Sequence, residues 1–172
     1  MKTRDLAAAA IFAALTFVVT RYTVIPIPAT RGFFNLGEVV IYIAALTSGP
    51  FVGMIAGGLG SSLADVAAGY GYYAPFTLVI KGIEGLIVGW LARPTATARL
   101  RATAVGGVWM ILGYFLSQVF FFQVLQFAAT QTAALTAAFT EMPFNVVQVA
   151  VGIVVGVPVA SRLAKLAPRP SD

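Results

Sequence analysis

Lys81 and Glu84 lie inside FTLVIKGIEGLIVGWLARP, residues 76–94, which is otherwise apolar and about long enough to cross a bilayer. A charged side chain near the bilayer centre costs about 2.5–3.5 kcal/mol on insertion scales, so such residues are functional candidates. The i, i+3 spacing lets the ammonium and the carboxylate meet on one face of a helix. The two residues are therefore either a structural ion pair or part of a site in which one of them also reaches a ligand or Asp65.

Polar side chains in the other apolar segments lie at a similar depth, toward the end opposite the positively charged loops. Glu141, Asn145 and Gln148 are spaced i, i+4 and i+7, so they line one helix face. This face is either a wall of a binding site or a helix N-terminal acid with interhelical hydrogen bonds. A channel, or a transporter with a midplane site, would carry polar residues deeper. The pattern favours a cup that opens outward above a dry helix bundle.

The predicted outer loops are rich in aromatic residues, as in GYGYYAP at 69–75. Such residues are typical of the interfacial belt of membrane proteins, and they would equally form a stacking surface for a planar ligand. Rings together with mixed charges favour a small planar heterocycle over a metal ion or a long lipid-like ligand. The predicted substrate-binding residues come from the loops and from the spans: Arg31, Phe33, Asn35, Glu38, Asp65, Tyr70, Tyr73, Lys81, Glu84, Gln118, Glu141, Asn145 and Gln148.

Composition points to a membrane protein without its own catalytic machinery. Of 172 residues, 59% are hydrophobic and only 10% are charged, against about 25% charged in a soluble domain, which indicates one membrane domain over residues 1–172. The absence of Cys and His excludes disulfides, thiol chemistry, His metal sites and His proton relays. Walker A, nucleophile-elbow and HExxH motifs do not occur, and GGLGSS at 57–62 has no following Lys. We therefore expect no enzyme activity, no cofactor and no bound metal.

Six apolar segments predict an all-α bundle of membrane-spanning helices, at about residues 5–20, 36–47, 51–68, 75–92, 103–126 and 141–162. The second segment is short, so it must tilt or be covered by protein at one end. Eight of the 11 Lys and Arg residues fall on one side, Arg21 and Arg31 fall on the other, and Lys81 lies within a span. This bias places both termini in the cytoplasm, and it explains the net charge of +5 without nucleic-acid binding.

Small residues recur at helical spacing in two of these spans. In the third, Gly49, Gly53, Gly57, Ser61 and Asp65 recur every four residues, a period that lets two helix backbones approach closely. In the first, AAAAIFAAL forms a strip that either packs inside the fold or docks another protein; its members are Ala9, Ala10, Ala13 and Ala14.

The long stretch FNLGEVVIYIAALTSGPFVGMIAGGLGSSLADVAAGYGYYAPFTLVIKGIEG, residues 34–85, resembles the substrate-binding S components of energy-coupling factor (ECF) vitamin transporters. The similarity is greatest to the riboflavin-type or hydroxymethylpyrimidine-type branch. The close match covers about a third of the chain, and the six-span pattern extends it over nearly all of it.

The resemblance implies a protein of the prokaryotic plasma membrane that binds a vitamin or precursor from outside, in a pocket built largely from helices 4–6. The loop at 21–35 would cap this pocket. The resemblance also implies association with a transmembrane coupling subunit, through Ala9, Ala10, Ala13 and Ala14, and with two cytoplasmic ATPases. S components are thought to topple in the membrane to release their ligand inside. The ligand itself stays open among riboflavin-like, hydroxymethylpyrimidine-like and pyridoxine-like compounds.

Two other function classes stay open on the residues alone. A self-sufficient secondary transporter would need a path for charge through the inner half of the spans, where the sequence is nearly all apolar. A membrane scaffold without a solute would leave the outward polar cup unexplained.

Overall fold

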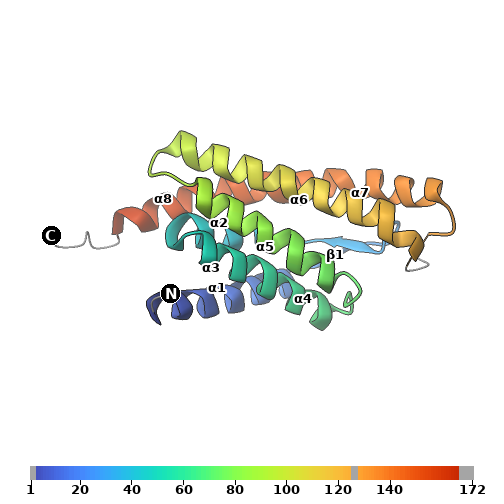
Figure 1. The fold of residues 1–172 in the computed structure, drawn as a ribbon, viewed down its shortest axis with the longest axis horizontal. Helices are drawn as coiled ribbons and strands as arrows, with labels where there is room; N and C mark the ends of the chain where they lie inside the picture. Colours follow the sequence, from blue (N-terminus) through green and yellow to red (C-terminus); the bar gives the residue numbers. More distant parts are fainter. Residues whose placement is uncertain (1–2, 125–127, 167–172) are drawn as a thin grey trace.

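Helices that run side by side along the long axis make up most of the structure (Figure 1). The computed structural model describes residues 3–124 and 128–166. Two spans are built from consecutive pieces, α3–η1–α4 and α7–η2–α8, in which η1 and η2 are π-helical. The elements in chain order are α1 (Thr3–Tyr22), β1 (Ile25–Ile27), β2 (Gly32–Phe34), α2 (Gly37–Ser48), α3 (Pro50–Ile55), η1 (Ala56–Gly60), α4 (Ser61–Ala68), α5 (Ala74–Leu91), α6 (Ala96–Val124), α7 (Gln131–Val151), η2 (Gly152–Gly156) and α8 (Val157–Leu166).

Five helical segments of the described chain are long and apolar enough to cross a bilayer: α1, α3–α4, α5, α6 and α7–α8. Helix α2 is a further apolar helix of 12 residues. Because α1 begins and α8 ends at the same end of the bundle, the chain crosses an even number of times (Figure 1). The predicted all-α membrane bundle is therefore confirmed.

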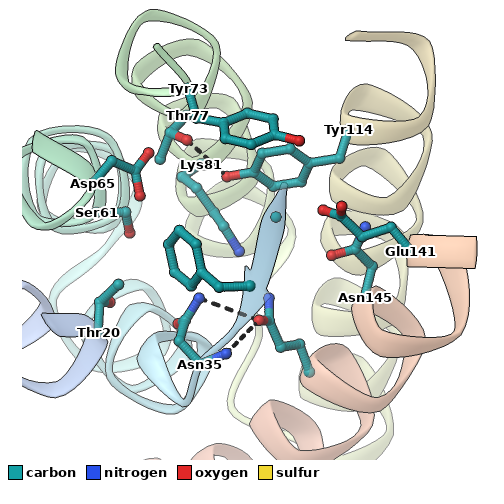
Figure 2. Close-up of a pocket in the computed structure, with 13 residues that line it drawn as sticks. Thr20, Asn35, Ser61, Asp65, Tyr73, Thr77, Lys81, Tyr114, Glu141 and Asn145 are labelled. Atoms are coloured by element: carbon teal, nitrogen blue, oxygen red, sulfur yellow. Dashed lines mark hydrogen bonds between the residues drawn. The ribbon is translucent and has the colours of Figure 1, made fainter. Parts of the chain in front are cut away.

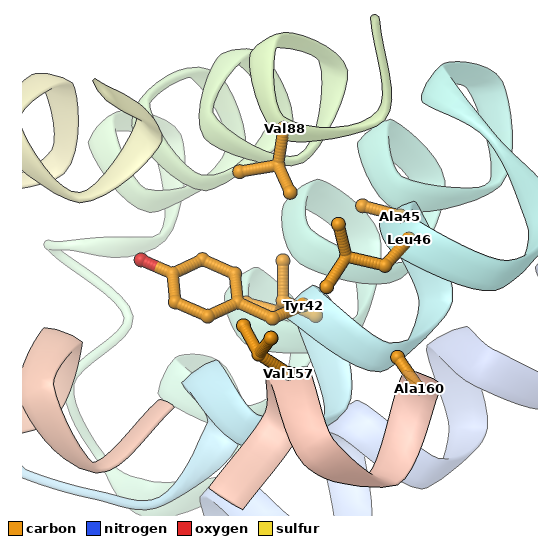
Figure 3. Close-up of a cluster of buried hydrophobic side chains, with 7 residues drawn as sticks. Tyr42, Ala45, Leu46, Val88, Val157 and Ala160 are labelled. Atoms are coloured by element: carbon orange, nitrogen blue, oxygen red, sulfur yellow. The ribbon is translucent and has the colours of Figure 1, made fainter. Parts of the chain in front are cut away.

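Helix α2 can be short because protein surrounds it. It contacts α1, α3, α5 and α8, and its residues Ile41 and Tyr42 are fully buried. Figure 3 shows the Tyr42 ring between Val88 of α5 and Val157 of α8. This apolar cluster fills the centre of the bundle on the side of α2 away from the hairpin, so packed side chains close that half of the bundle.

Helix α6 begins before the predicted range of 103–126. The Thr95 hydroxyl accepts a hydrogen bond from the Ala98 N–H at 3.3 Å, which caps the first turn. Arg99 then stays in the helix, because its guanidinium donates to the Ser161 hydroxyl of α8 at 2.8 Å. The prediction excluded these charged residues from the span, whereas a helix can continue past the bilayer into water.

Helix α7 likewise begins before the predicted range of 141–162. The Thr130 side chain accepts from the Ala133 N–H at 3.1 Å, and the alanine-rich stretch that follows favours a helix. Pro143, which is typical of a helix start, instead lies inside α7. These ten additional residues extend α7 beyond the predicted span, at the end of the bundle opposite the two termini.

The segment expected to be a loop at 21–35 begins with the last residues of α1 and then forms an ordered hairpin. After α1 ends, β1 and β2 pair antiparallel, with Ile25 opposite Phe34 and Ile27 opposite Gly32. Pro26 is accommodated because a two-stranded ribbon consists only of edge strands. Figure 1 shows the hairpin beyond α2, toward the end of the bundle opposite the two termini.

Hydrogen bonds from neighbouring elements hold both ends of this hairpin. In its turn, Arg31 has a φ of 56°, a left-handed conformation that non-glycine residues rarely adopt. The Arg31 carbonyl accepts from the Tyr72 hydroxyl at 2.8 Å. At the other end, the Leu36 N–H donates to the Thr23 hydroxyl at 2.9 Å. The hairpin is therefore tied to the loop before α5 and to the end of α1.

The predicted glycine stripe brings the third span close to α5, but not along its whole length. A Cβ atom on Gly85 would overlap the carbonyl oxygen of Gly53, and one on Gly57 would overlap that of Lys81. Gly49 differs from the other members, because it ends α2 with a φ of 90° and has open space around it. The stripe therefore serves packing at its centre, and it fixes the backbone that carries Lys81.

We predict that Gly85→Ala separates α3 from α5 and destabilises the fold by about 1–3 kcal/mol, as overpacking does elsewhere. Gly82→Ala is the matched control on the same helix, because its Cβ would find ordinary contacts at 3.7 Å or more. Thermal unfolding of the purified proteins in detergent measures both. Equal unfolding temperatures for the two variants would contradict this account of the packing.

Candidate functional site

A cavity lies at the hairpin end of the bundle, among the hairpin and helices α1, α4, α5, α6 and α7 (Figure 2). Its space for the centres of water molecules is about 30 Å³, enough for about two or three waters. A larger ligand therefore requires the walls to move apart. The lining combines carboxylates, one lysine, amides, hydroxyls and rings: Thr20, Gly32, Phe33, Asn35, Ser61, Asp65, Tyr73, Thr77, Lys81, Tyr114, Glu141, Asn145 and Gln148.

Lys81 is the centre of a buried ion cluster below the cavity. Its ammonium forms an ion pair with the carboxylate of Glu38 on α2, and Glu84 Oε2 lies 3.7 Å away. The second Glu84 oxygen accepts from the Tyr42 hydroxyl at 2.9 Å. The predicted pairing of Lys81 with Glu84 thus exists, but the closer partner comes from a helix that spacing within α5 could not identify.

The site contains several carboxyl groups and a single cationic side chain, that of Lys81. Lys81 is only 3% exposed, and its two carboxylate partners are fully buried. Its Nζ also lies 5.6 Å from the centre of the Tyr114 ring, within the range of a cation–π contact. Two further acids, Asp65 and Glu141, line the cavity itself. Within the described residues, no group of three or more acids comes together in a way that could hold a metal ion.

Glu141 forms the α7 wall together with residues of α6 and the α5 N-terminus. The Gln118 amide donates both to the Glu141 carboxylate and to the Tyr73 hydroxyl, the latter at 3.1 Å. Burial raises the pKa of the Tyr73 hydroxyl, and the nearby Glu141 carboxylate raises it further, so this hydroxyl stays protonated. A Cβ on Gly32 would overlap the carboxylate, so only glycine lets the hairpin lie against this wall.

Gln148, on the same face of α7, fixes the end of the hairpin. Its side-chain oxygen accepts from the Asn35 backbone N–H at 2.7 Å and from the Asn35 amide at 3.1 Å. The Asn35 side-chain oxygen in turn accepts from the Gly37 N–H at 2.8 Å, which begins α2. These two predicted site residues therefore line the cavity while their main hydrogen bonds hold the backbone.

Eight predicted residues line the cavity, and five do not. Those that line it are Phe33, Asn35, Asp65, Tyr73, Lys81, Glu141, Asn145 and Gln148. Those outside the lining support it from behind or lie toward solvent: Arg31, Glu38, Tyr70, Glu84 and Gln118.

Five lining residues were missed by the sequence analysis, among them Gly32 of the hairpin. Ser61 lies one turn before Asp65, and Thr77 lies one turn before Lys81, so helical spacing could have found both. Thr20 and Tyr114 carried no such signal, because they belong to other helices and have side chains common in membrane spans. Only the packing of α1 and α6 brings them to the site.

The loop aromatics pack on one another over the outer side of the cavity. The Phe33 and Tyr70 rings lie 4.6 Å apart, and those of Tyr72 and Tyr73 lie 5.1 Å apart. Tyr73 also contacts the Tyr114 ring edge-on at 6.5 Å. Three of these rings line the cavity, where they supply apolar faces beside the polar groups.

The alanine strip of α1 divides between two faces. Ala9 is only 1% exposed and packs against Ala44, Val52 and Ala56, so its side chain cannot dock a partner as predicted. Ala13 is half-buried, whereas the other two members, Ala10 and Ala14, are exposed. Because α-helical residues four apart share a face, Ala9 and Ala13 form a row that faces the fold, and Ala10 and Ala14 form a second row that is exposed.

We predict that Lys81→Met destabilises the protein by about 3–5 kcal/mol, because it leaves buried carboxylates without their cation. Adding Glu38→Gln to Lys81→Met should recover part of this loss by removing one of the orphaned charges. Thermal unfolding in detergent of the two single variants and the double variant gives the coupling. An additive double variant would show that the pair contributes no interaction.

Comparisons with known proteins agree with this geometry. The model of the family described as "ECF-type riboflavin transporter, S component" matches residues 1–165. An "uncharacterized protein in gap 3′ region" of Pyrococcus woesei is 50% identical over 99 residues, which cover 56% of this chain and 66% of the relative. The "thiamine precursor transporter HmpT" of Lactococcus lactis subsp. cremoris is 40% identical over 81 residues, which cover 46% of this chain and 49% of the relative. The chain thus spans less than two thirds of either relative. Since the family match covers almost its whole length, the chain belongs to the S components of ECF-type riboflavin transporters.

Proposed function

We propose that this S component captures a small planar heterocycle, a vitamin or vitamin precursor, on the outer side of the membrane and delivers it inside. Its family makes it a membrane transport protein. The observation that carries the finer proposal is the cavity at the hairpin end, where Asp65, Lys81 and Glu141 meet the rings of Phe33 and Tyr114. Polar groups that fix orientation within aromatic walls are the usual composition of a site for a small organic molecule.

The charges of the site indicate a neutral or cationic ligand. Two acids line the cavity, and two more lie below it on the single lysine. A phosphorylated vitamin would bring negative charge beside Asp65 and Glu141, where the surroundings screen it poorly. Carboxylates accept hydrogen bonds and cannot donate them when ionised, so the site suits ring N–H, amino and hydroxyl groups.

The size of the cavity favours a single-ring ligand of the thiamine-precursor type, such as hydroxymethylpyrimidine. Because the cavity has room for only about two or three waters, a single ring would require less displacement of the walls than a fused three-ring system would. The 40% identity with HmpT, a thiamine precursor transporter, supports the same choice.

Riboflavin is the second candidate, and the family model favours it. Its larger ring system would require the hairpin to move outward. The hairpin strands are only three residues long, and the cavity includes Gly32 and Phe33 from β2. A short two-stranded ribbon is marginally stable by itself, so a modest displacement is compatible with the fold.

Energy for uptake is supplied by partner proteins in this proposal. The partners are a transmembrane coupling subunit and two cytoplasmic ATPases, in a prokaryotic plasma membrane. The exposed row of Ala10 and Ala14 offers a flat surface on which another helix can pack closely. A secondary transporter is less well supported, because the cluster of Tyr42, Val88 and Val157 below the ion cluster gives no path for charge.

The ligand proposal predicts that the purified protein binds hydroxymethylpyrimidine more tightly than its phosphate ester by at least tenfold, because the acids repel the phosphate. Isothermal titration with hydroxymethylpyrimidine, riboflavin, pyridoxine and their phosphate esters measures this, and mass spectrometry identifies any ligand carried through purification. Tighter binding of the phosphate esters, or binding of no heterocycle, would contradict the proposal.

The coupling proposal predicts that Ala10→Leu leaves ligand affinity within about twofold and abolishes uptake in cells that also express the coupling subunit and ATPases, because a large side chain keeps the helices apart. Ala150→Leu, an exposed position on α7 across the bundle, is the matched control and should preserve uptake (Figure 1). Uptake that persists in Ala10→Leu, or in cells without the ATPases, would exclude this arrangement.

A further inference from the structure

Two buried oxygens on the α1–α4 wall of the cavity have unused hydrogen-bonding capacity. Asp65 is 2% exposed, and its Oδ2 atom has no hydrogen-bond partner among residues 3–124 and 128–166. The Thr20 hydroxyl oxygen, on the facing part of α1, has none there either. Both residues line the cavity, with Ser61 between them in Figure 2. A buried acceptor without a hydrogen-bond partner destabilises the protein, and a bound donor group would remove this penalty.

Several other polar groups of the lining already have partners within the protein. Gln148 accepts twice from Asn35, and the Glu141 carboxylate accepts from Gln118. Lys81 is paired with two carboxylates. These groups complete their interactions through the fold itself, whereas Asp65 Oδ2 and the Thr20 hydroxyl are buried without a partner among the described residues, so an external partner is favourable at this wall.

We propose that Asp65, Thr20 and Ser61 form a recognition subsite that accepts hydrogen bonds from an amino or ring N–H group of the ligand. An ionised carboxylate can only accept, and the hydroxyls of Thr20 and Ser61 can accept as well as donate. When it is ionised, the Asp65 carboxylate forms shorter and stronger hydrogen bonds than the two hydroxyls do, so we expect Asp65 to contribute most to the subsite. The proposal deepens the proposed function and rests on it, because it assigns one edge of the same heterocycle.

The geometry places this subsite opposite the Glu141 wall. In Figure 2, Asp65 and Glu141 lie on opposite sides of the cavity, with Lys81 and Tyr114 between them. The Tyr114 hydroxyl donates to the Thr77 hydroxyl at 3.0 Å, next to Asp65, and so orients this side of the wall. A ring held here presents one donor edge to α1–α4 and another to α7. Loss of the donor at the first edge then removes a contact that no other lining residue replaces.

The test uses the full-length protein with two pairs of probes. Hydroxymethylpyrimidine, which carries an exocyclic amine, is compared with the analogue in which hydrogen replaces the amine. Riboflavin, which has one ring imide N–H, is compared with N3-methylriboflavin. Isothermal titration gives affinities for the wild type and for Asp65→Asn, Thr20→Val and Ser62→Ala. Ser62 is the matched control, because its hydroxyl is buried nearby but bonds to the Leu59 carbonyl at 3.3 Å outside the cavity lining.

We expect Asp65→Asn to weaken binding of the donor-bearing probe by about 10- to 100-fold, the usual effect of losing a hydrogen bond to a charged group. The same variant should change binding of the donor-free analogue by less than about threefold. Thr20→Val should act in the same direction with a smaller loss, and Ser62→Ala should match the wild type. Thermal unfolding and gel filtration verify that each variant is folded, and Thr20→Val carries the test if Asp65→Asn is unstable.

The outcomes separate the two proposals. A wild type that binds neither heterocycle overturns the proposed function, and this subsite with it. A wild type that binds, while Asp65→Asn and Thr20→Val lose equal affinity for both members of a probe pair, overturns the subsite alone. Equal affinities of Asp65→Asn, Thr20→Val and Ser62→Ala would do the same.

Discussion

The buried ion cluster of Glu38, Lys81 and Glu84 is the constraint on which the rest of the structure depends. Charges so deeply buried require paired partners with fixed geometry, because removing them from water is costly. The cluster joins α2 to α5, and the Tyr42 hydroxyl bonds to one of its carboxylates. Glycines in η1 and α5 hold the backbone of Lys81 against the third span. The floor of the cavity therefore depends on how α2, α5 and the third span pack together.

The hairpin is a stretch of non-helical backbone within a bundle of membrane helices. Such backbone is tolerated only where protein or a cavity surrounds it, since lipid cannot satisfy its polar groups. The two strands satisfy each other, and Gln148, Thr23 and Tyr72 satisfy the flanking groups. Gly32 lets the hairpin approach Glu141. The same segment thus covers the cavity and contributes part of its wall.

Hydrogen-bond satisfaction divides the polar residues of the site into two kinds. Glu38, Glu84 and Gln118 lie behind the lining and position the groups that face it. Asp65 and Thr20 face the cavity with acceptors that the protein does not use. Spacing along the sequence could not distinguish these kinds, because it does not show which side chains of other helices lie within hydrogen-bonding distance. The distinction matters for a transport protein, since the second kind has unused acceptors to offer a ligand.

Composition and periodicity were sufficient to predict the membrane bundle and the polar face of Glu141, Asn145 and Gln148, because these depend on local spacing and on the bilayer. The early starts of α6 and α7 were missed, since helices continue past the bilayer when capped. The sequence also could not identify partners on different helices. Lys81 pairs with Glu38, and Thr20 lines the same cavity as Asp65, only because separate helices pack together. The residue types and their faces followed from the sequence by itself. Which side chains are satisfied within the protein was decided by the tertiary structure, because hydrogen bonds and ion pairs depend on distances between helices.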